Sequence, residues 1–170
     1  VRSLISHGIE AEIVTTHADG RQSLKVVGGK RILYQGAPVY FFPRTLRTEY
    51  KFSWPLTQWL RRNIQNYDLL HLHSIFCYPT AIAAHYTRKF RIPYILRPAG
   101  MLEDWSLNQK SFRKRLYLNL IENKNLGSAN ALHYTSEEEK KGSERFAFSR
   151  RGVVVPLGID LDSQSQKVER

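Results

Sequence analysis

Two histidines separated by one residue end the apolar segment 68–73, and a serine follows them. Side chains alternate along a β-strand, so His71 and His73 would point to the same face of a sheet. Neutral imidazoles there can bind a metal ion, transfer a proton or hydrogen-bond a ligand hydroxyl. A zinc site is not favoured, because no HExxH or CxxC motif supplies further ligands. His71 also fits a hydrogen-bonded core position, which leaves His73 and Ser74 as the stronger candidates for a binding site.

The motif RPAGM begins at Arg97, directly after a second apolar segment, residues 93–96. The guanidinium of Arg97 can bind a phosphate or carboxylate through two parallel hydrogen bonds. Gly100 lets the backbone approach a ligand closely because it has no Cβ atom. We therefore expect Arg97, Gly100 and Met101 to line a binding site, with a surface arginine before a turn as the alternative.

A third segment, 131–134, is followed by Ser136 and Glu139, which have the spacing of a capping box at a helix start. The free N–H groups of such a helix can receive an anion. We therefore expect both residues to line the same cleft, although capping alone would also explain them.

The last apolar segment, 152–155, leads into the motif PLGID. A rigid proline with a glycine two residues later is typical of a hinge. We therefore predict that Pro156, Gly158 and Asp160 form a hinge.

These four sites follow short apolar segments that alternate with amphipathic ones. The patterns predict helices over residues 1–7, 54–66, 79–90, 111–126 and 136–146, strands over 10–15, 32–34, 39–42, 68–73, 93–96, 131–134 and 152–155, and a loop over 18–30. Phe112, Leu116 and Leu120 mark the expected apolar face of the fourth helix. Strands that alternate with helices indicate an α/β fold with a doubly wound, mainly parallel sheet and helices on both faces. Ligands bind such sheets beyond the carboxyl ends of the strands, where the candidate sites lie.

Several classes of protein are excluded or not supported. The 170 residues have 42% hydrophobic residues and one cysteine, Cys77, which excludes a disordered chain and an internal disulfide. The sequence lacks GxGxxG, GxxxxGK[ST] and GxSxG motifs, so a typical dinucleotide site, a P-loop and a hydrolase elbow are not indicated. No apolar run reaches the roughly 20 residues of a membrane-spanning helix. A single thiol and no signal-peptide pattern favour a cytoplasmic location.

The chain has a formal charge of +11, concentrated in residues 21–62, which we call the basic zone. This zone holds nine Lys or Arg and one acid, and aromatic residues lie within it, among them Tyr40, Phe41, Phe42, Tyr50, Phe52, Trp54 and Trp59. Such a composition suggests a phosphate-rich partner, either an anionic membrane surface or stacked nucleic-acid bases. The absence of a K/R-G-F-G-F signature gives nucleic acid the lower weight. A solvated basic surface is the remaining alternative.

Four segments in this order resemble the N-terminal half of family 4 glycosyltransferases: DLLHLHSIFCYPTAIAAHYTRKFRIPYILRPAGML, a W-x-L stretch followed by spaced lysines, ANALHYTSEEE and VVVPLGID. The family has the GT-B fold, in which two Rossmann-like lobes enclose the active site. The resemblance implies a Rossmann-like N-terminal domain over residues 1–160, with 161–170 beginning an interdomain linker. Leu157 stands where the family usually has Asn.

The resemblance further implies the acceptor-binding lobe of a retaining enzyme that transfers a sugar from a nucleotide-sugar, without an essential metal or other cofactor. The acceptor would be a glycan or a lipid-linked glycan of polysaccharide biosynthesis. The enzyme would be cytoplasmic or peripheral on the inner face of the membrane, with no nucleic-acid partner. The motifs of the acceptor side match His71, His73, Ser74, Arg97, Gly100 and Met101, and those of the cleft match Ser136 and Glu139. No catalytic residue is identified.

We expect a first strand with a Gly-rich loop before Val1, and a donor-binding lobe with an E-x7-E motif after Arg170. The 170 residues alone are therefore predicted to be inactive. The rival prediction is a non-enzymatic Rossmann-like module with a basic face that binds nucleic acid.

Overall fold

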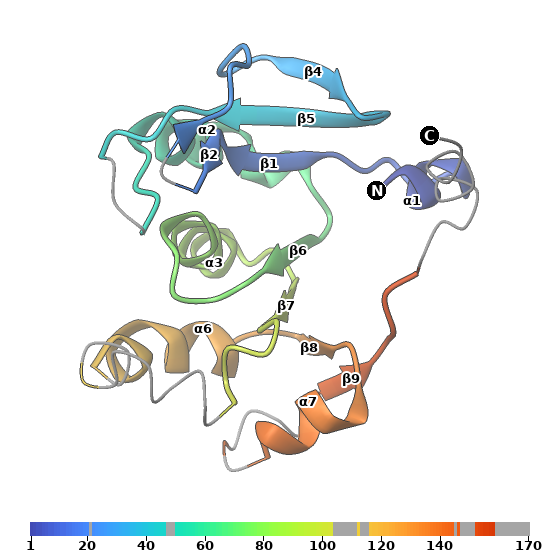
Figure 1. Cartoon of the computed structure of the whole chain (residues 1–170), viewed down its shortest axis with the longest axis vertical. Helices are drawn as coiled ribbons and strands as arrows, with labels where there is room; N and C mark the ends of the chain where they lie inside the picture. Colours follow the sequence, from blue (N-terminus) through green and yellow to red (C-terminus); the bar gives the residue numbers. More distant parts are fainter. Residues whose placement is uncertain are drawn as a thin grey trace, which may run out of the picture.

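The computed structural model describes residues 1–20, 22–46, 50–103, 112, 116–144, 146 and 152–158. Its helical elements are α1 (Arg2–Ser6), α2 (Trp54–Asn63), the 3₁₀ turn η1 (Ile64–Asn66), α3 (Tyr78–Phe90), the π-helical turn η2 (Leu118–Glu122), α6 (Asn123–Gly127) and α7 (Glu137–Gly142) (Figure 1). Its strands are β1 (Ile13–Thr16), β2 (Ala18–Asp19), β3 (Gln22–Ser23), β4 (Arg31–Tyr34), β5 (Ala37–Phe42), β6 (Leu70–His73), β7 (Tyr94–Arg97), β8 (Ala131–Tyr134) and β9 (Gly152–Val154).

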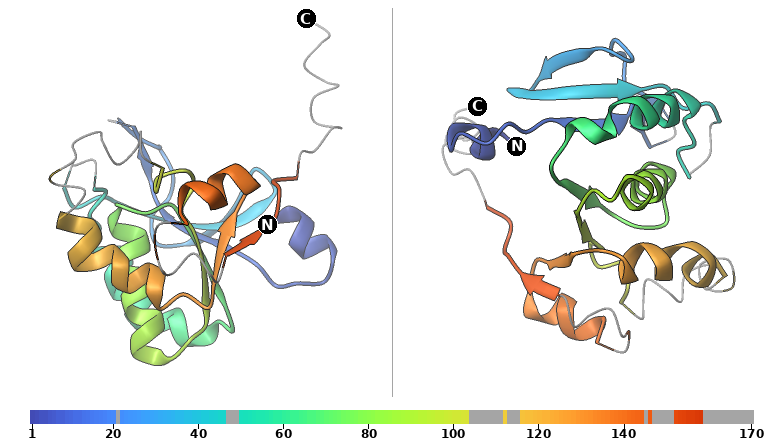
Figure 2. Two further views of the ribbon diagram at one scale, coloured as in Figure 1. Left: turned by 90° about the horizontal axis from the view of Figure 1, so that it is seen from below. Right: turned by 180° about the vertical axis from the view of Figure 1, so that it is seen from behind.

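The strands form two main sheets, and most neighbouring strands in them are parallel. One sheet has the order β6-β7-β8-β9, and the other has the order β1-β5-β4. Every pair in the first sheet is parallel, as is β1 with β5, whereas β4 runs antiparallel to β5. Helices α2, α3 and α6 are stacked beside one another (Figure 2). This arrangement confirms the predicted Rossmann-like α/β fold.

Strand β5 is buried on both faces, which agrees with its continuous apolar sequence. Phe42 belongs to the main hydrophobic core. Ala37, Val39 and Phe41 form a second, smaller core, against which Ile32 and Tyr34 of β4 pack. The turn between β4 and β5 has two residues with positive φ, Gln35 and Gly36, which is the turn that suits a two-residue hairpin.

Helix α2 is capped by Ser53. The hydroxyl of Ser53 accepts a hydrogen bond from the backbone N–H of Leu56 at 3.3 Å and donates one to the carbonyl of Pro43 at 2.7 Å. Ser53 is fully buried, so this cap also anchors the helix to Pro43, the residue that follows β5. Leu56 and Leu60 are the buried side chains that α2 contributes to the main core.

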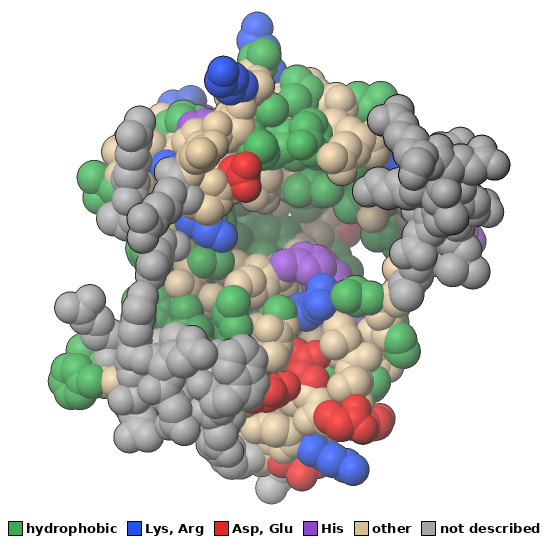
Figure 3. All heavy atoms as spheres, in the orientation of Figure 1, with side chains coloured by type: hydrophobic (Ala, Val, Ile, Leu, Met, Phe, Trp, Pro, Cys, Tyr) green, Lys and Arg blue, Asp and Glu red, His purple; other side chains and the backbone are tan. Residues whose placement is uncertain are grey.

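The edge strands β1 and β6 face each other across a hollow. Figure 1 shows β6 below β1, and Figure 3 shows the molecule hollowed between them. In the part of the chain that the structure describes, neither strand pairs with another on this side. Side chains therefore join the two sheets: Val14, Phe42 and Leu72 lie in one core cluster, and the Tyr67 hydroxyl donates a hydrogen bond to the Glu12 carboxylate.

The expected apolar face of the fourth helix was wrong. Phe112, Leu116 and Leu120 are 79%, 50% and 70% exposed. The buried side chains of this segment are Leu118, Glu122, Asn125 and Leu126. Their spacing is helical, but the pattern was missed because two of the four are polar and are buried through hydrogen bonds.

The aromatic residues of the basic zone do not form one exposed surface. Six of those named above are buried or pack against other rings: Tyr40, Phe41, Phe42, Tyr50, Phe52 and Trp59. Trp54 differs from them, because 54% of it is exposed.

Smaller differences concern the ends of elements. The predicted loop over 18–30 contains the β2–β3 hairpin, and α7 ends at Gly142 rather than near residue 146. The strand expected from residue 10 begins at Ile13.

Candidate functional site

Strands β6, β7 and β8 are adjacent and parallel, so their carboxyl ends meet at one edge of the sheet. His73 and Arg97 are register partners and the last residues of their strands. The next strand pairs Leu132 with Leu96, which places His133 in the same row as Arg97 and His73. The fold thus brings two predicted site residues together and adds a third side chain, His133, to the same face.

The segment after β6 contacts the segment after β7. The backbone N–H of Ser74 donates to the carbonyl of Arg97 at 2.8 Å, and the Ser74 hydroxyl approaches the Met101 sulfur at 3.4 Å. Four predicted residues, Ser74, Arg97, Gly100 and Met101, therefore lie along one pair of strand ends.

Glu139 connects the segment after β7 to the segment after β8. Its carboxylate accepts hydrogen bonds from the backbone N–H of Gly100 at 2.7 Å and from the backbone N–H and hydroxyl of Thr135 at 2.8 and 2.9 Å. Ser136 caps α7 by accepting from the Glu139 N–H at 3.2 Å. Burial alone would raise the pKa of Glu139, but the hydrogen bonds from Thr135 and Gly100 outweigh it and lower that pKa. Ser136 thus has the predicted capping role, whereas the Glu139 carboxylate bonds to Thr135 and Gly100 instead of the Ser136 N–H and so fixes the RPAGM loop.

Backbone strain is concentrated at the same strand ends. Ser74, Phe76 and Ala99 have φ values of 76°, 58° and 57°. Side-chain-bearing residues rarely adopt these angles, and such strain is found more often at functional sites. Gly100 also has a positive φ of 71°, which explains a glycine at this position of the loop.

His71 and His133 form a hydrogen-bonded chain that ends on the backbone. The Nε2 atom of His133 lies 2.7 Å from the carbonyl oxygen of Val155, and its Nδ1 lies 3.1 Å from Nε2 of His71. A carbonyl can only accept, so Nε2 of a neutral His133 carries the proton and its Nδ1 is an acceptor. His71 must then carry its proton on Nε2, and its Nδ1 is left as an acceptor.

The environment keeps both strand histidines neutral. Both side chains are exposed on this face, but partial burial of the His71 ring, followed by His73, His133 and Arg97, lowers the pKa of His71 to about 4. Burial and the Arg97 charge lower the pKa of His73. The rings of His71 and His73 lie 4.4 Å apart between centroids, and Figure 3 shows histidine side chains lining the hollow on this face. Neutral imidazoles here can accept hydrogen bonds from ligand hydroxyls.

Arg97 supplies positive charge beside these imidazoles. Its Nε atom is buried and has no hydrogen-bond partner among the residues that the structure describes. Buried N–H groups are nearly always paired in folded proteins. An unpaired one at a strand end therefore points to an acceptor supplied by a ligand.

Sequence reasoning missed His133, because it lies within an apolar strand pattern. A signal was present, since His133 precedes the polar segment after β8 as His71 and His73 precede the segment after β6. In the described part of the chain, no group of three or more His, Cys, Asp or Glu residues is placed to hold a metal ion.

The predicted hinge residues follow β9. Pro156 and Gly158 are exposed and lie in no helix or strand, and the N–H of Val155 still pairs with the carbonyl of Tyr134 at 2.9 Å. Asp160 lies outside the described residues.

Within the residues described, no helix is both long enough and apolar enough to cross a membrane.

A comparison with known protein families matches residues 1–158 to the glycosyl transferase 4-like domain. A search of curated proteins found no significant match. The family match spans nearly the whole chain and agrees with its α/β fold. Together these findings show that the chain belongs to the glycosyl transferase 4-like domain family, with a general role in glycosyl transfer.

Proposed function

We propose that this chain is the acceptor-binding part of a retaining glycosyltransferase. The enzyme moves a sugar from a nucleotide-sugar to a glycan or a lipid-linked acceptor in polysaccharide biosynthesis, without a resident metal or other cofactor. The observation that carries the proposal is the unpaired, buried Nε of Arg97 beside two neutral imidazoles at the carboxyl ends of β6 and β7.

Each group has a role in holding an acceptor. Arg97 binds an anionic group, such as the diphosphate of a lipid-linked sugar, and His71 and His73 accept hydrogen bonds from sugar hydroxyls. Gly100 brings backbone close to the ligand, and Glu139 holds that loop in place through the Gly100 N–H. Binding and orientation of this kind can lower a reaction barrier by several kcal/mol. Residues that stabilise the departing diphosphate of the donor are not assigned to this chain.

Replacing Arg97 tests the proposed acceptor site. A prenyl diphosphate of short chain length carrying one sugar is titrated into the protein by isothermal calorimetry. Arg97→Ala should weaken binding about 10- to 100-fold, because a charge-assisted hydrogen bond contributes about 1.5–3 kcal/mol. Arg97→Lys should retain part of the affinity that Arg97→Ala loses, since lysine keeps the positive charge but lacks the planar guanidinium group. The double variant Lys140→Ala/Lys141→Ala removes two charges from the last turn of α7 and should bind like the wild type. Equal affinity in wild type and Arg97→Ala would refute the assignment.

The proposed peripheral location rests on a basic and apolar edge at β4. Leu33 is 76% exposed and Val27 is 57% exposed, next to the exposed Lys25 and Lys30. Apolar side chains flanked by lysines suit the surface of an anionic membrane.

Vesicle flotation tests this location. The protein should float with vesicles that contain anionic lipid at low salt, and less so at high salt because the charges are screened. Leu33→Ser should reduce flotation, with Leu157→Ser as a control at another exposed leucine. The same recovery with neutral and anionic vesicles would argue against the proposal.

A further inference from the structure

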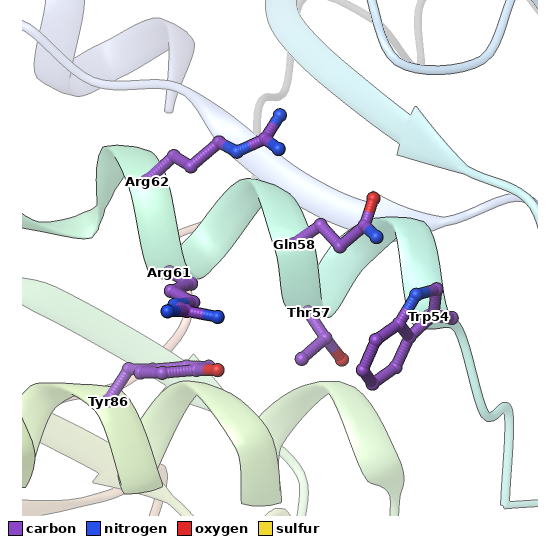
Figure 4. A pocket seen from close by; sticks show the side chains of 6 residues that line it. All are labelled: Trp54, Thr57, Gln58, Arg61, Arg62 and Tyr86. Carbon is purple, nitrogen blue, oxygen red and sulfur yellow. The ribbon is translucent and has the colours of Figure 1, made fainter.

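A groove between α2 and α3 lies outside the strand-end site. It has a volume of about 410 Å³ and is lined by Trp54, Thr57, Gln58, Arg61, Arg62 and Tyr86. Figure 4 shows Trp54 at one end and Arg61 above the ring of Tyr86. Five of these residues belong to α2, and each has another of the five three or four positions away, so they form neighbouring rows along one helix. The volume falls in the range of small-molecule binding sites.

The groove has aromatic walls of two kinds. Trp54 is 54% exposed, whereas the Tyr86 ring is 8% exposed and belongs to the main core. The other aromatic residues of the basic zone are packed within the fold, so the exposed indole of Trp54 is an exception among them. An exposed aromatic plane beside polar groups suits a ligand with one apolar face and several hydroxyls.

The groove also has unpaired positive charge. Arg61 and Arg62 are exposed, and no hydrogen bond or ion pair joins either side chain to any residue that the structure describes. Both lie in the last turn of α2, where the helix dipole favours cations. This placement explains why positively charged residues occur here. Both guanidinium groups remain free to bind a carboxylate or phosphate through paired hydrogen bonds.

We propose that the α2–α3 groove binds an acidic saccharide. The apolar face of a sugar ring lies against Trp54, the carboxylate or phosphate group is bound by Arg61 and Arg62, and the Gln58 amide hydrogen-bonds a hydroxyl. The Thr57 hydroxyl is already bonded to Ser53 and Tyr78, so it has a structural role. The proposal draws on the glycosyltransferase family and does not depend on the acceptor site at Arg97. Because the groove is concave and presents one exposed aromatic ring, a single sugar chain is a more suitable ligand for it than a flat membrane surface.

Titration of the chain with a trisaccharide of galacturonic acid tests this proposal, with maltotriose as the neutral probe of equal length. The acidic trisaccharide should change the fluorescence of Trp54 and shift amide NMR signals of α2, and maltotriose should do neither. Trp54→Ala and Arg61→Ala/Arg62→Ala should each weaken binding at least 10-fold, and Trp54→Phe should keep most of it. Circular dichroism confirms that each variant folds.

Two controls separate this groove from the rest of the surface. Lys140→Ala/Lys141→Ala removes the same charge from α7 and should leave the affinity unchanged. Arg97→Ala should also leave it unchanged, which separates this test from that of the acceptor site. Loss of binding in Arg97→Ala with retention in Arg61→Ala/Arg62→Ala would overturn the proposal, as would equal affinity for the neutral probe. It would equally fail if single-stranded DNA or anionic vesicles shifted the α2 signals while the acidic trisaccharide did not.

Discussion

At the scale of single residues, His133 determines which nitrogen of His71 is available to a ligand. Its bond to the Val155 carbonyl fixes its own proton, and its Nδ1 then fixes the proton of His71. This arrangement presents Nδ1 of His71 as an acceptor without any charged group. His133 is therefore a positioning residue for the site, and it links the site to the segment that follows β9.

Two substitutions of His133 separate its two hydrogen bonds. In His133→Asn the side-chain oxygen takes the place of Nδ1 and keeps the acceptor for His71. In His133→Gln the amide nitrogen takes the place of Nε2 and keeps the donor to Val155. We expect His71 to remain the Nε2–H tautomer in His133→Asn and to lose this preference in His133→Gln. Long-range ¹⁵N–¹H NMR of the imidazole rings from pH 4 to pH 8 measures the tautomers directly.

The same spectra test the protonation of His71. Its pKa of about 4 predicts a neutral ring throughout the physiological range. Because the unfolded chain binds this proton near pH 6.5, the unfolded state holds more protons between these values, and stability falls as the pH drops through that window. Titration of His71 near pH 6.5 in the folded wild type would contradict the proposed environment.

At the scale of elements, two buried carboxyl groups anchor helices in opposite electrostatic settings. Glu139 binds three donors, and its pKa is lowered. Glu122 lies in the π-helical turn and accepts from the Phe76 N–H at 2.8 Å and from the Asn125 amide at 3.0 Å. Burial raises the pKa of Glu122 despite these bonds and the charge of Arg88. Both carboxyls hold a loop at a strand end, but they should respond to pH in opposite ways.

The pH dependence of unfolding should separate the two. A lowered pKa adds stability above the unfolded value of about 4.5, and this contribution is lost as pH falls through the folded pKa. Glu139→Gln should therefore cost about 1–3 kcal/mol near neutral pH and less at acidic pH. A raised pKa acts oppositely, because its contribution is lost as pH rises, so the cost of Glu122→Gln should shrink towards neutral pH. Urea unfolding of both variants between pH 3.5 and 7 provides the measurement, and parallel pH profiles would show this account to be incorrect.

The elements also show which parts of the site could be predicted. The proximity of His73, Ser74, Arg97 and Gly100 could be predicted from the sequence, because the carboxyl ends of parallel strands lie at one sheet edge. The burial of Glu122 and Asn125 could not be found, since hydrogen bonds to Phe76 and Arg88 make these polar residues suitable for the core. The exposed face of Phe112, Leu116 and Leu120 was misassigned for the same reason. Side-chain partners far apart in sequence decide such cases.

At the scale of the whole molecule, alternation and order of the segments were enough to predict the fold class and the family resemblance. They did not predict that the strands divide into two sheets with facing edges. Strand patterns identify which segments are extended, but they carry little information on which strands pair with one another. The direction of β4 was also undetermined, although the two-residue turn at Gln35 and Gly36 accounts for its antiparallel course.

The facing edges of β1 and β6 have a consequence for how the molecule opens. Backbone hydrogen bonds hold each sheet together internally, whereas side chains such as Val14, Phe42 and Leu72 join one sheet to the other. When sheets are joined only by side-chain packing, one sheet can unfold locally while the other remains folded. Cooperative units of different stability arise in this way. Amide hydrogens of β1, β4 and β5 would then exchange as one group, at a different rate from those of β6 to β9.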